Sequence, residues 1–315
     1  MALPLMDTGI VVIGRNEGER LRRCLESLPR GIPIVYADSG SSDDSLSLAR
    51  SLGVDTLACT PPFSAARARN EGFSWLIERH PGLRYVQFLD GDCTLFSGWL
   101  EAGARALEAE PQRAVVTGEL LERDADGSAY SRLCAMEWRS PPGEVRALGG
   151  IAMMRADVFH AVGGYRPEVI AGEDSELGVR MALAGYKVTK IAPLMATHEA
   201  GITRFSQWWR RAVRAGHAIG QRSHLNGGSA LRDCVHERNS VLFWGIGLPL
   251  LSVSAAPGSL LLLWAYAALW LRVWQRRRSA LYATFVVIGK FANALGLARF
   301  YLNKLAGRYA IIEYK

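Results

Sequence analysis

The chain has 315 residues, of which 49% are hydrophobic, so it can bury a substantial core in one large domain or two modest ones. Its formal net charge is +7, and arginines cluster on both sides of an apolar C-terminal stretch, which favours lipid headgroups or a phosphorylated substrate over nucleic acid. Five scattered cysteines without a Cys-x-x-Cys pair exclude a disulfide framework and indicate a reducing compartment.

The first 200 or so residues alternate short β-branched runs with segments of helical periodicity. We expect strands over residues 9–14, 32–38, 84–90 and 113–120, and helices over 17–28 and 41–53. Strands that alternate with helices are typical of an α/β fold, in which a largely parallel sheet is covered on both faces.

Polar residues follow three of these strands. They are Arg15–Glu17 after the first strand, Asp38 at the end of the second, and Asp90 and Asp92 at the end of the third. Ligands of such sheets bind beyond the carboxyl ends of the strands, so we expect the three clusters to face one crevice. An Asp-x-Asp pair there can hold a divalent cation that clamps a diphosphate, although a solvated acidic turn is the simpler alternative.

The C-terminal part differs in character, because no charged residue lies between Val241 and Leu271. Pro249 and Pro257 interrupt this run, and each half is short for a membrane span, so we expect a re-entrant or interfacial hairpin rather than a single crossing. The basic residues that follow should stay cytoplasmic, and the amphipathic stretch 281–308 can lie in the membrane interface. A buried helical subdomain is the alternative. We therefore expect a catalytic domain over 1–230 and a membrane-associated helical region over 231–315.

Six segments, in this order, resemble the family 2 glycosyltransferases of the GT-A fold. They are VVIGRNEGERLRRCLESL, VYADSGSSDDS, AARARNEG, YVQFLDGDC, ALGGIAMMRADVFHAVGGY and GEDSELGVRMALAGYKV, and they span most of residues 8–205. The resemblance implies a Rossmann-like, mixed and mostly parallel sheet flanked by helices. It also implies inverting transfer of a sugar from a nucleoside diphosphate donor to an acceptor hydroxyl. We expect a uridine diphosphate sugar as the donor, and the membrane-associated tail suggests a lipid-linked or surface-glycan acceptor.

The resemblance assigns the donor nucleotide to residues near the first strands. Arg15, Asn16 and Glu17 match the element that contacts the base and ribose. Asp38 matches the aspartate that pairs with the base, and a carboxylate can accept the imide N–H of a uracil-like base. Arg69 matches an arginine near the base and the diphosphate.

The metal site implied by the resemblance is a divalent cation, Mn²⁺ or Mg²⁺, at the Asp-x-Asp (DXD) motif. Asp92 is the expected ligand, and Asp90, separated from it by Gly91, contacts the ribose or reaches the metal through water. His198 is expected to be a further ligand, since imidazole suits Mn²⁺. A structural histidine is the alternative.

The resemblance places the catalytic base on Asp174, which would remove the proton of the acceptor hydroxyl. Glu173 would orient the acceptor or donor. Repulsion between adjacent carboxylates can raise the pKa of one of them, although the pair also reads as an acidic helix start. Gly149 and Gly150 would let the backbone approach the sugar, or form a plain turn.

A basic segment follows, with Gln207, Trp208, Arg210 and Arg211 as candidates for binding the acceptor or the diphosphate. It partly resembles the Gln-x-x-Arg-Trp signature of processive members of the family. Arg211 stands in place of the signature tryptophan, which argues against processive polymerisation. Trp208 would stack on an acceptor sugar or anchor in the membrane interface, and a basic membrane-facing helix is the alternative.

Two other functions are considered. A nucleotidyltransferase on a related fold would need a glycine- and lysine-rich phosphate loop, which VIGRNEGER lacks. A non-catalytic membrane-associated protein that binds nucleotide or glycan has no need for Asp92, Asp174 and His198 together. We expect an enzyme at the cell membrane, with its catalytic domain on the cytoplasmic side and no nucleic-acid partner.

Overall fold

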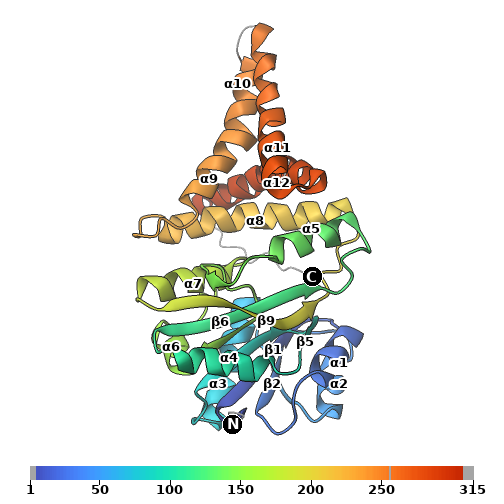
Figure 1. Cartoon of the computed structure of the whole chain (residues 1–315), viewed down its shortest axis with the longest axis vertical. Helices are drawn as coiled ribbons and strands as arrows, with labels where there is room; N and C mark the ends of the chain where they lie inside the picture. The colour runs from blue at the N-terminus through green and yellow to red at the C-terminus, as the bar shows by residue number, and fades with distance from the viewer. Residues whose placement is uncertain (1–4, 255–256, 308–315) are drawn as a thin grey trace. The chain divides into compact units, whose positions relative to one another are not determined.

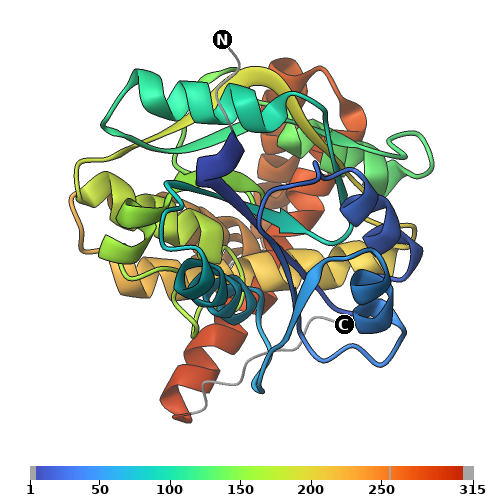
Figure 2. The ribbon, with the colours of Figure 1, turned by 90° about the horizontal axis from the view of Figure 1, so that it is seen from below.

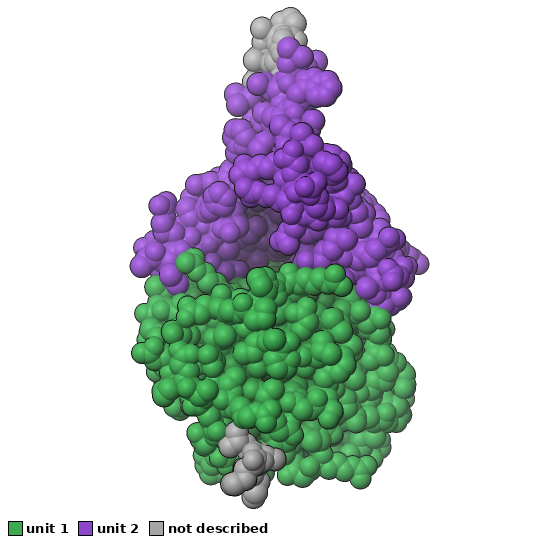
Figure 3. Space-filling view, viewed as in Figure 1, with its two compact units in different colours: residues 1–123, 138–200, 311–315 green, residues 124–137, 201–310 purple. Residues whose placement is uncertain are grey.

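A computed structural model describes residues 5–254 and 257–307, which fall into two compact units (Figure 3). Unit 1 comprises residues 1–123, 138–200 and 311–315, and unit 2 comprises residues 124–137 and 201–310. The predicted functional domains, 1–230 and 231–315, are a different division and stay a prediction. The end of the predicted amphipathic stretch, at Arg308, lies outside the described residues.

Unit 1 contains the predicted strands and helices, and the strand expected over residues 113–120 continues to Glu122. Its elements are η1 (Leu5–Asp7), β1 (Thr8–Gly14), α1 (Glu19–Glu26), β2 (Ile34–Asp38), α2 (Ser45–Ser51), β3 (Asp55–Ala58), α3 (Ala65–Arg79), β4 (Tyr85–Asp90), β5 (Cys93–Leu95), α4 (Trp99–Ala109), β6 (Arg113–Glu122), β7 (Gly143–Glu144), β8 (Ala152–Arg155), α6 (Ala156–Ala161), α7 (Glu173–Leu183) and β9 (Lys187–His198).

These strands form one mixed sheet in the order β3-β2-β1-β4-β8-β6-β9-β5, with β7 paired to β9 (Figure 1). Strands β1 to β4 pair in parallel. On the other side of β4, strand β8 is antiparallel to both of its neighbours, and β6 pairs in parallel with β9. The mixed α/β sheet is confirmed, and its parallel half provides the strand ends after Gly14, Asp38 and Asp90.

Alternating residues of the strands send their side chains into two cores, one on each face of the sheet. On β1, Val11 and Ile13 belong to one core, whereas Ile10 and Val12 belong to the other. Helices α3, α6 and α7 cover the first face, and α1, α2 and α4 cover the second (Figures 1 and 2). Because both faces are covered, the end of the sheet is where a ligand can reach the strands.

Unit 2 is helical. Its elements are α5 (Ala129–Trp138), α8 (Phe205–Asn226), α9 (Val235–Leu242), the π-helical turn η2 (Phe243–Gly247), α10 (Leu248–Ser254), the 3₁₀ segment η3 (Pro257–Leu263), α11 (Trp264–Arg277) and α12 (Ala280–Leu305).

Helices α8 and α12 lie side by side at very short range within unit 2 (Figure 1). A Cβ added at Gly216 would lie 2.0 Å from the carbonyl oxygen of Asn293, and one added at Gly296 would lie 1.9 Å from that of Val213. Only glycine therefore allows the two backbones to approach this closely. Helix α12 is also the one described helix that is long and apolar enough to cross a membrane by length and composition.

Candidate active site

The end of β4 carries the Asp-x-Asp motif into a tight turn. The N–H of Gly91 donates to the carbonyl of Ile13 at 2.7 Å, which holds the turn against β1. Strand β5 then begins at Cys93 and pairs antiparallel with β9, with Cys93 opposite His198. This strand pairing brings His198 beside Asp92, although the two residues are far apart in the chain.

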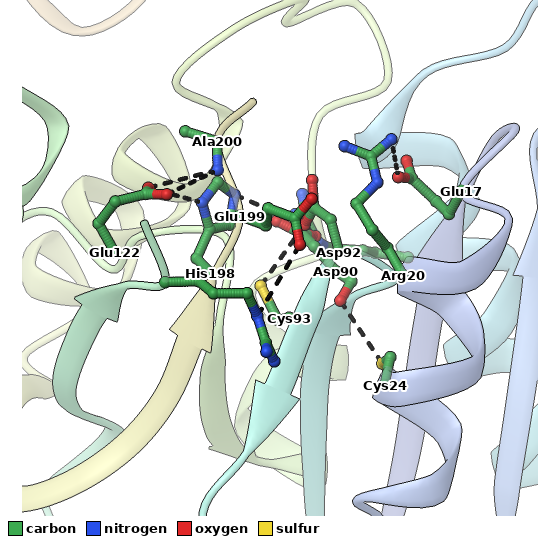
Figure 4. Close-up of polar contacts among 12 residues, drawn as sticks. Glu17, Arg20, Cys24, Asp90, Asp92, Cys93, Glu122, His198, Glu199 and Ala200 are labelled. Atoms are coloured by element: carbon green, nitrogen blue, oxygen red, sulfur yellow. Dashed lines mark hydrogen bonds and ion pairs between the residues drawn. The ribbon is translucent and has the colours of Figure 1, made fainter. Parts of the chain in front are cut away.

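Asp92, His198 and Glu122 form a row at the end of the sheet (Figure 4). Nε2 of His198 lies 3.5 Å from Oδ1 of Asp92, and Nδ1 lies 3.9 Å from Oε2 of Glu122. The Nδ1 atom is buried without a hydrogen-bond partner among the described residues. The indole ring of Trp138 meets the imidazole edge-on, with ring centroids 4.7 Å apart. The imidazole therefore lies between two carboxylates, with Nε2 directed to the motif aspartate.

Ligand atoms of Asp92, Cys93 and His198 lie within 4.8 Å of one another, which is compatible with a metal site. Burial, together with the nearby Asp92 and Asp90 carboxylates, raises the pKa of the Cys93 thiol well above its ordinary value. A thiol that stays protonated is a poor metal ligand. Asp92 and His198 are therefore the better ligand pair. Burial alone would lower the pKa of His198, but Glu122, Asp92 and Asp90 outweigh it and the net shift is upward.

Arg69 on α3 joins the motif strand to α7. Its guanidinium donates to Oδ1 of Asp90 at 2.7 Å and to Oε1 of Glu173 at 2.7 Å. The arginine is only 2% exposed, whereas the side chains of Asp90 and Glu173 are partly exposed, at 28% and 13%. Burial lowers the pKa of Arg69, but Asp90, Tyr165 and Glu173 raise it further than burial lowers it. The guanidinium is thus a fixed positive charge that connects two candidate site residues.

Gly150 makes room for this ion pair. A Cβ added there would lie 2.7 Å from a terminal nitrogen of Arg69 and 2.7 Å from Oδ2 of Asp90. Its neighbour Gly149 has a left-handed backbone, with φ of +66°, and no atom within 4 Å of the site of a Cβ. The ring of Tyr165 lies 5.3 Å from the Arg69 guanidinium carbon. Gly150 therefore contributes to the packing of the site, whether or not a sugar approaches it.

Helix α7 begins at Glu173 after Gly172, whose left-handed backbone marks the N-cap position. Asp174 is therefore in the first turn, where the helix dipole favours a negative charge. Glu173 is held by Arg69, so the two adjacent carboxylates have different surroundings. Negative charges of Asp174, Glu173 and Asp90 all act on Tyr165, whose pKa is raised chiefly by burial.

The loops after β1 and β2 are tied together. Asn16 has a left-handed backbone, and its side-chain oxygen accepts the N–H of Ser42 at 2.8 Å. Asp38 is 1% exposed and accepts hydrogen bonds from the hydroxyl of Tyr36 and from the N–H of Ser41. A donor nucleobase that contacts Asp38 must therefore bind a carboxylate that already accepts hydrogen bonds from its own loop.

The other two candidates near the first strand are also engaged. Glu17 is buried and pairs with Arg20 at 2.7 Å, and the Arg15 guanidinium carbon lies 5.4 Å from the centre of the Phe63 ring. Together with the tied loops, these contacts hold the residues that follow β1 and β2 in place. The assignment of these residues to a base and ribose stays a prediction.

The four basic-segment candidates belong to unit 2, on α8. Gln207 accepts the N–H of Arg204 at 2.9 Å and completes a capping box at the start of the helix. Trp208 is buried and meets Phe285 edge-on at 4.6 Å. Arg211 donates to Glu137 at 2.8 Å, and Arg210 is exposed. In this structure Gln207 and Trp208 thus have structural contacts within unit 2.

Glu122 and Tyr165 are site residues that the sequence reasoning missed. Glu122 accepts the N–H of Ala200 in addition to lying beside His198. A signal for Glu122 existed, because it ends an apolar strand just as Asp90 does. Tyr165 carries no such signal, since it lies in a loop after Gly163 and Gly164.

Comparison with known proteins finds glycosyltransferases. Residues 9–162 match the family described as glycosyl transferase family 2. Glycosyltransferase AglE of Haloferax volcanii is 24% identical over 231 residues, 69% of this chain and 74% of that protein. The pre-mycofactocin glycosyltransferase of Mycobacterium tuberculosis is 25% identical over 221 residues, and this match spans 65% of the chain but 45% of that relative.

Solved structures show the same fold at low sequence identity. The mannosyltransferase PcManGT from Pyrobaculum calidifontis, in complex with GDP-Man and Mn²⁺, aligns with a TM-score of 0.62 and 20% identity over 92% of this chain and 87% of that one. S. aureus TarS 1–349 in complex with UDP-GlcNAc aligns with a TM-score of 0.54 and 14% identity over 96% and 92%. The GT-A fold, the homologous glycosyltransferases and the matched domain lead to one conclusion: the chain is a glycosyltransferase, and its residues 9–162 match glycosyl transferase family 2.

Proposed function

We propose that this glycosyltransferase is inverting and metal-dependent, and that it transfers a sugar from a nucleoside diphosphate donor to a hydroxyl of a lipid-linked or surface-glycan acceptor. The observation that carries the proposal is the Arg69 bridge. It holds Asp90 of the DXD motif and Glu173, the neighbour of Asp174, to one guanidinium. The bridge favours a single site in which a donor diphosphate and a catalytic carboxylate meet.

A divalent cation fits the residues at the motif. Asp92 offers a carboxylate and His198 an imidazole, both of which suit Mn²⁺, and Nε2 of His198 already faces Asp92. These two residues would hold the metal, while Glu122 would keep the imidazole oriented from its other side. When bound, the metal supplies positive charge to the departing diphosphate.

Asp174 is our candidate for the general base. It would accept the proton of the acceptor hydroxyl while that oxygen bonds to the anomeric carbon, and the bond from that carbon to the donor phosphate oxygen would break with its electron pair on the phosphate. Attack opposite the leaving group inverts the anomeric carbon. Glu173 is less suited to this role, because its carboxylate is already engaged by the Arg69 guanidinium at 2.7 Å.

We assign the donor to a chemical class and not to one compound. Two proteins with this fold carry GDP-Man and UDP-GlcNAc in their structures, which supports a nucleoside diphosphate sugar and leaves the base to be tested. We retain a uridine diphosphate sugar as first choice, because the carboxylate of Asp38 can accept an imide N–H. The charge-free run after Val241 and its flanking arginines support a location at the cytoplasmic face of the cell membrane, next to a lipid-linked acceptor.

A thermal-shift experiment tests the proposal on the detergent-purified full chain. Melting would be followed with UDP, GDP, dTDP and CDP, each with and without Mn²⁺, for the wild type and Asp92→Ala. A ligand that binds only the folded state raises the melting temperature. We expect one diphosphate to stabilise the wild type only with Mn²⁺, and Asp92→Ala to lose this effect. Stabilisation of both proteins to the same extent would contradict the metal role of Asp92.

A further inference from the structure

A long apolar hairpin projects from the helices of unit 2. We define the apolar hairpin as residues 235–254 (α9, η2 and α10) together with residues 257–277 (η3 and α11). Its limbs lie side by side (Figure 1) and contact each other, since the ring of Tyr266 is 5.7 Å from that of Trp244 and its hydroxyl donates to the Trp244 carbonyl. The two limbs therefore form one structural element within this unit.

The surface of the apolar hairpin consists of large hydrophobic side chains that are exposed. Val253 is 83% exposed, Leu261 68% and Trp264 73%. Other exposed side chains of the same kind on the hairpin are Leu242, Phe243, Leu250, Leu251, Leu260, Leu262, Leu263 and Leu271. A contiguous apolar surface of this kind marks a site that contacts a lipid or another protein.

The charge pattern around the apolar hairpin favours anionic lipid over protein. The hairpin has no charged residue from Val241 to Leu271, and no acidic residue lies between Glu237 and Glu313. Arginines 272, 276, 277 and 278 gather at the end of α11, two of them near aromatic rings. The apolar tip of the hairpin matches the hydrocarbon layer of an anionic membrane, and the arginines and aromatic rings at its other end match the headgroup layer.

The length of the limbs determines how far they can enter. From Val241 to Ser254 the first limb extends about 21 Å as a helix. From Pro257 to Leu271 the second extends about 26 Å, counting η3 as a 3₁₀ helix. Both lengths exceed one leaflet, about 15 Å, and fall short of the hydrocarbon core of about 30 Å. The hairpin can therefore enter one leaflet and return, but it cannot present its tip to water on the far side.

Helix α12 is the competing membrane element, and its packing argues against a crossing. Gly296 and Asn293 of α12 lie against the backbone of α8, which is a polar helix that carries Arg210 and Arg222. Lys290 and Arg299 interrupt the apolar sequence of α12 itself. To cross the membrane, α12 would have to separate from α8 or carry the charged residues of both helices into the hydrocarbon core. Both are costly in free energy.

We propose that the apolar hairpin inserts into one leaflet of an anionic membrane and returns to the same side, with the α11 arginines at the headgroups. This inference makes the membrane location in the proposed function more specific, and it rests on that proposed function. The occupant is the lipid bilayer, and a second copy of the chain is the alternative that the experiment has to exclude.

Flotation of the full chain with lipid vesicles tests the insertion. The protein, purified in detergent and then freed of it, would be added to phosphatidylcholine vesicles with and without phosphatidylglycerol. We expect binding to the anionic vesicles. The double variant Val253→Asp/Leu261→Asp should reduce partitioning by about a hundredfold for each aspartate that must enter lipid. Leu183→Asp, which replaces an exposed leucine of unit 1, should bind as the wild type does.

A fluorophore at the tip tests the one-leaflet geometry. All five native cysteines are buried, so a dye on Val253→Cys reports one position. We expect quenching by lipids brominated in the acyl chains and protection from an aqueous quencher on either side of the vesicle. Quenching by a reagent trapped inside the vesicle would show a crossing, and quenching only from outside would show no insertion. Either result overturns the proposal.

Two further readouts separate this inference from the proposed function. Size-exclusion chromatography in detergent compares the oligomeric state of the tip double variant with that of the wild type. If the wild type is a dimer, the double variant is a monomer and neither protein binds vesicles, the hairpin is a self-association surface. Mn²⁺-dependent stabilisation by a nucleoside diphosphate should be the same for both proteins. If that stabilisation is absent from both while vesicle binding depends on the tip, the insertion stands and the assigned donor site fails.

Discussion

The two units of the molecule differ in where their charged residues lie and in how these residues are paired. In unit 1, buried charges are paired at fixed positions, as Arg69 is with Asp90 and Glu173. In unit 2, residues 238–310 include no acidic residue, and many of the described side chains there are large, apolar and exposed. The difference fits our two proposals, in which unit 1 binds a charged donor together with a metal and the apolar hairpin of unit 2 enters a membrane. Substitutions in each unit should therefore affect different measurements.

The largest effect is expected from Asp174→Asn, which removes the proposed base while retaining its size. Sugar transfer should fall by about 10²–10⁴-fold, because that is the usual contribution of a positioned general base. Donor-induced thermal stabilisation should not change. Transfer would be followed by release of the nucleoside diphosphate, with Asp55→Asn on the exposed edge strand β3 as the control. Wild-type turnover in Asp174→Asn would assign the base elsewhere.

Arg69→Met should destabilise unit 1 strongly, because it leaves the partly buried carboxylates of Asp90 and Glu173 without their shared cation. Removing one partner from a buried ion pair costs about 3–5 kcal/mol. Arg67→Met is a matched control on the same helix, since Arg67 forms only a partly exposed pair with Glu71 at 3.6 Å. Denaturant unfolding of the two variants gives the comparison. Equal free energies of unfolding for both would contradict the bridging role of Arg69.

Glu122→Gln should weaken metal binding without unfolding the protein. The amide oxygen can still accept the Ala200 N–H, so the substitution removes chiefly the negative charge near Nδ1 of His198. Loss of such an orienting partner typically lowers metal affinity by about 10–100-fold. Calorimetric titration with Mn²⁺ would measure it, with the exposed Glu144→Gln as control. An unchanged affinity would make Glu122 a purely structural residue.

The last prediction concerns the stability of unit 2 at acidic pH. Burial, with Arg214 adding to it, lowers the pKa of His217 to about 4. An unfolded histidine titrates near 6.5, so the folded state binds fewer protons and loses stability as pH falls from about 6.5 to about 4. His217→Leu should flatten this part of the melting profile, whereas the exposed His160→Leu should not. Identical profiles for the two variants would show that His217 does not titrate as expected.

Much of unit 1 could be predicted from the sequence because its signals are local. The strands follow from runs such as Gly9–Gly14, and the edge of the sheet follows from the polar residues after them. The α/β fold was predicted on these grounds and is confirmed. The antiparallel position of β8 was not predicted, since strand direction depends on where the chain crosses the sheet and not on the residues of the strand.

The sequence could predict which residues belong to the candidate site, but not which of them contact one another. The sequence alone determined that Asp90, Asp92 and the Glu173–Asp174 pair stand at the ends of strands or helices, because periodicity and capping act over a few residues. Only the tertiary structure decided that Arg69 reaches Glu173, 104 residues away, and that Glu122 stands beside His198. Such contacts arise when distant strands and helices pack, and no local pattern encodes the distance between two side chains that meet only after folding.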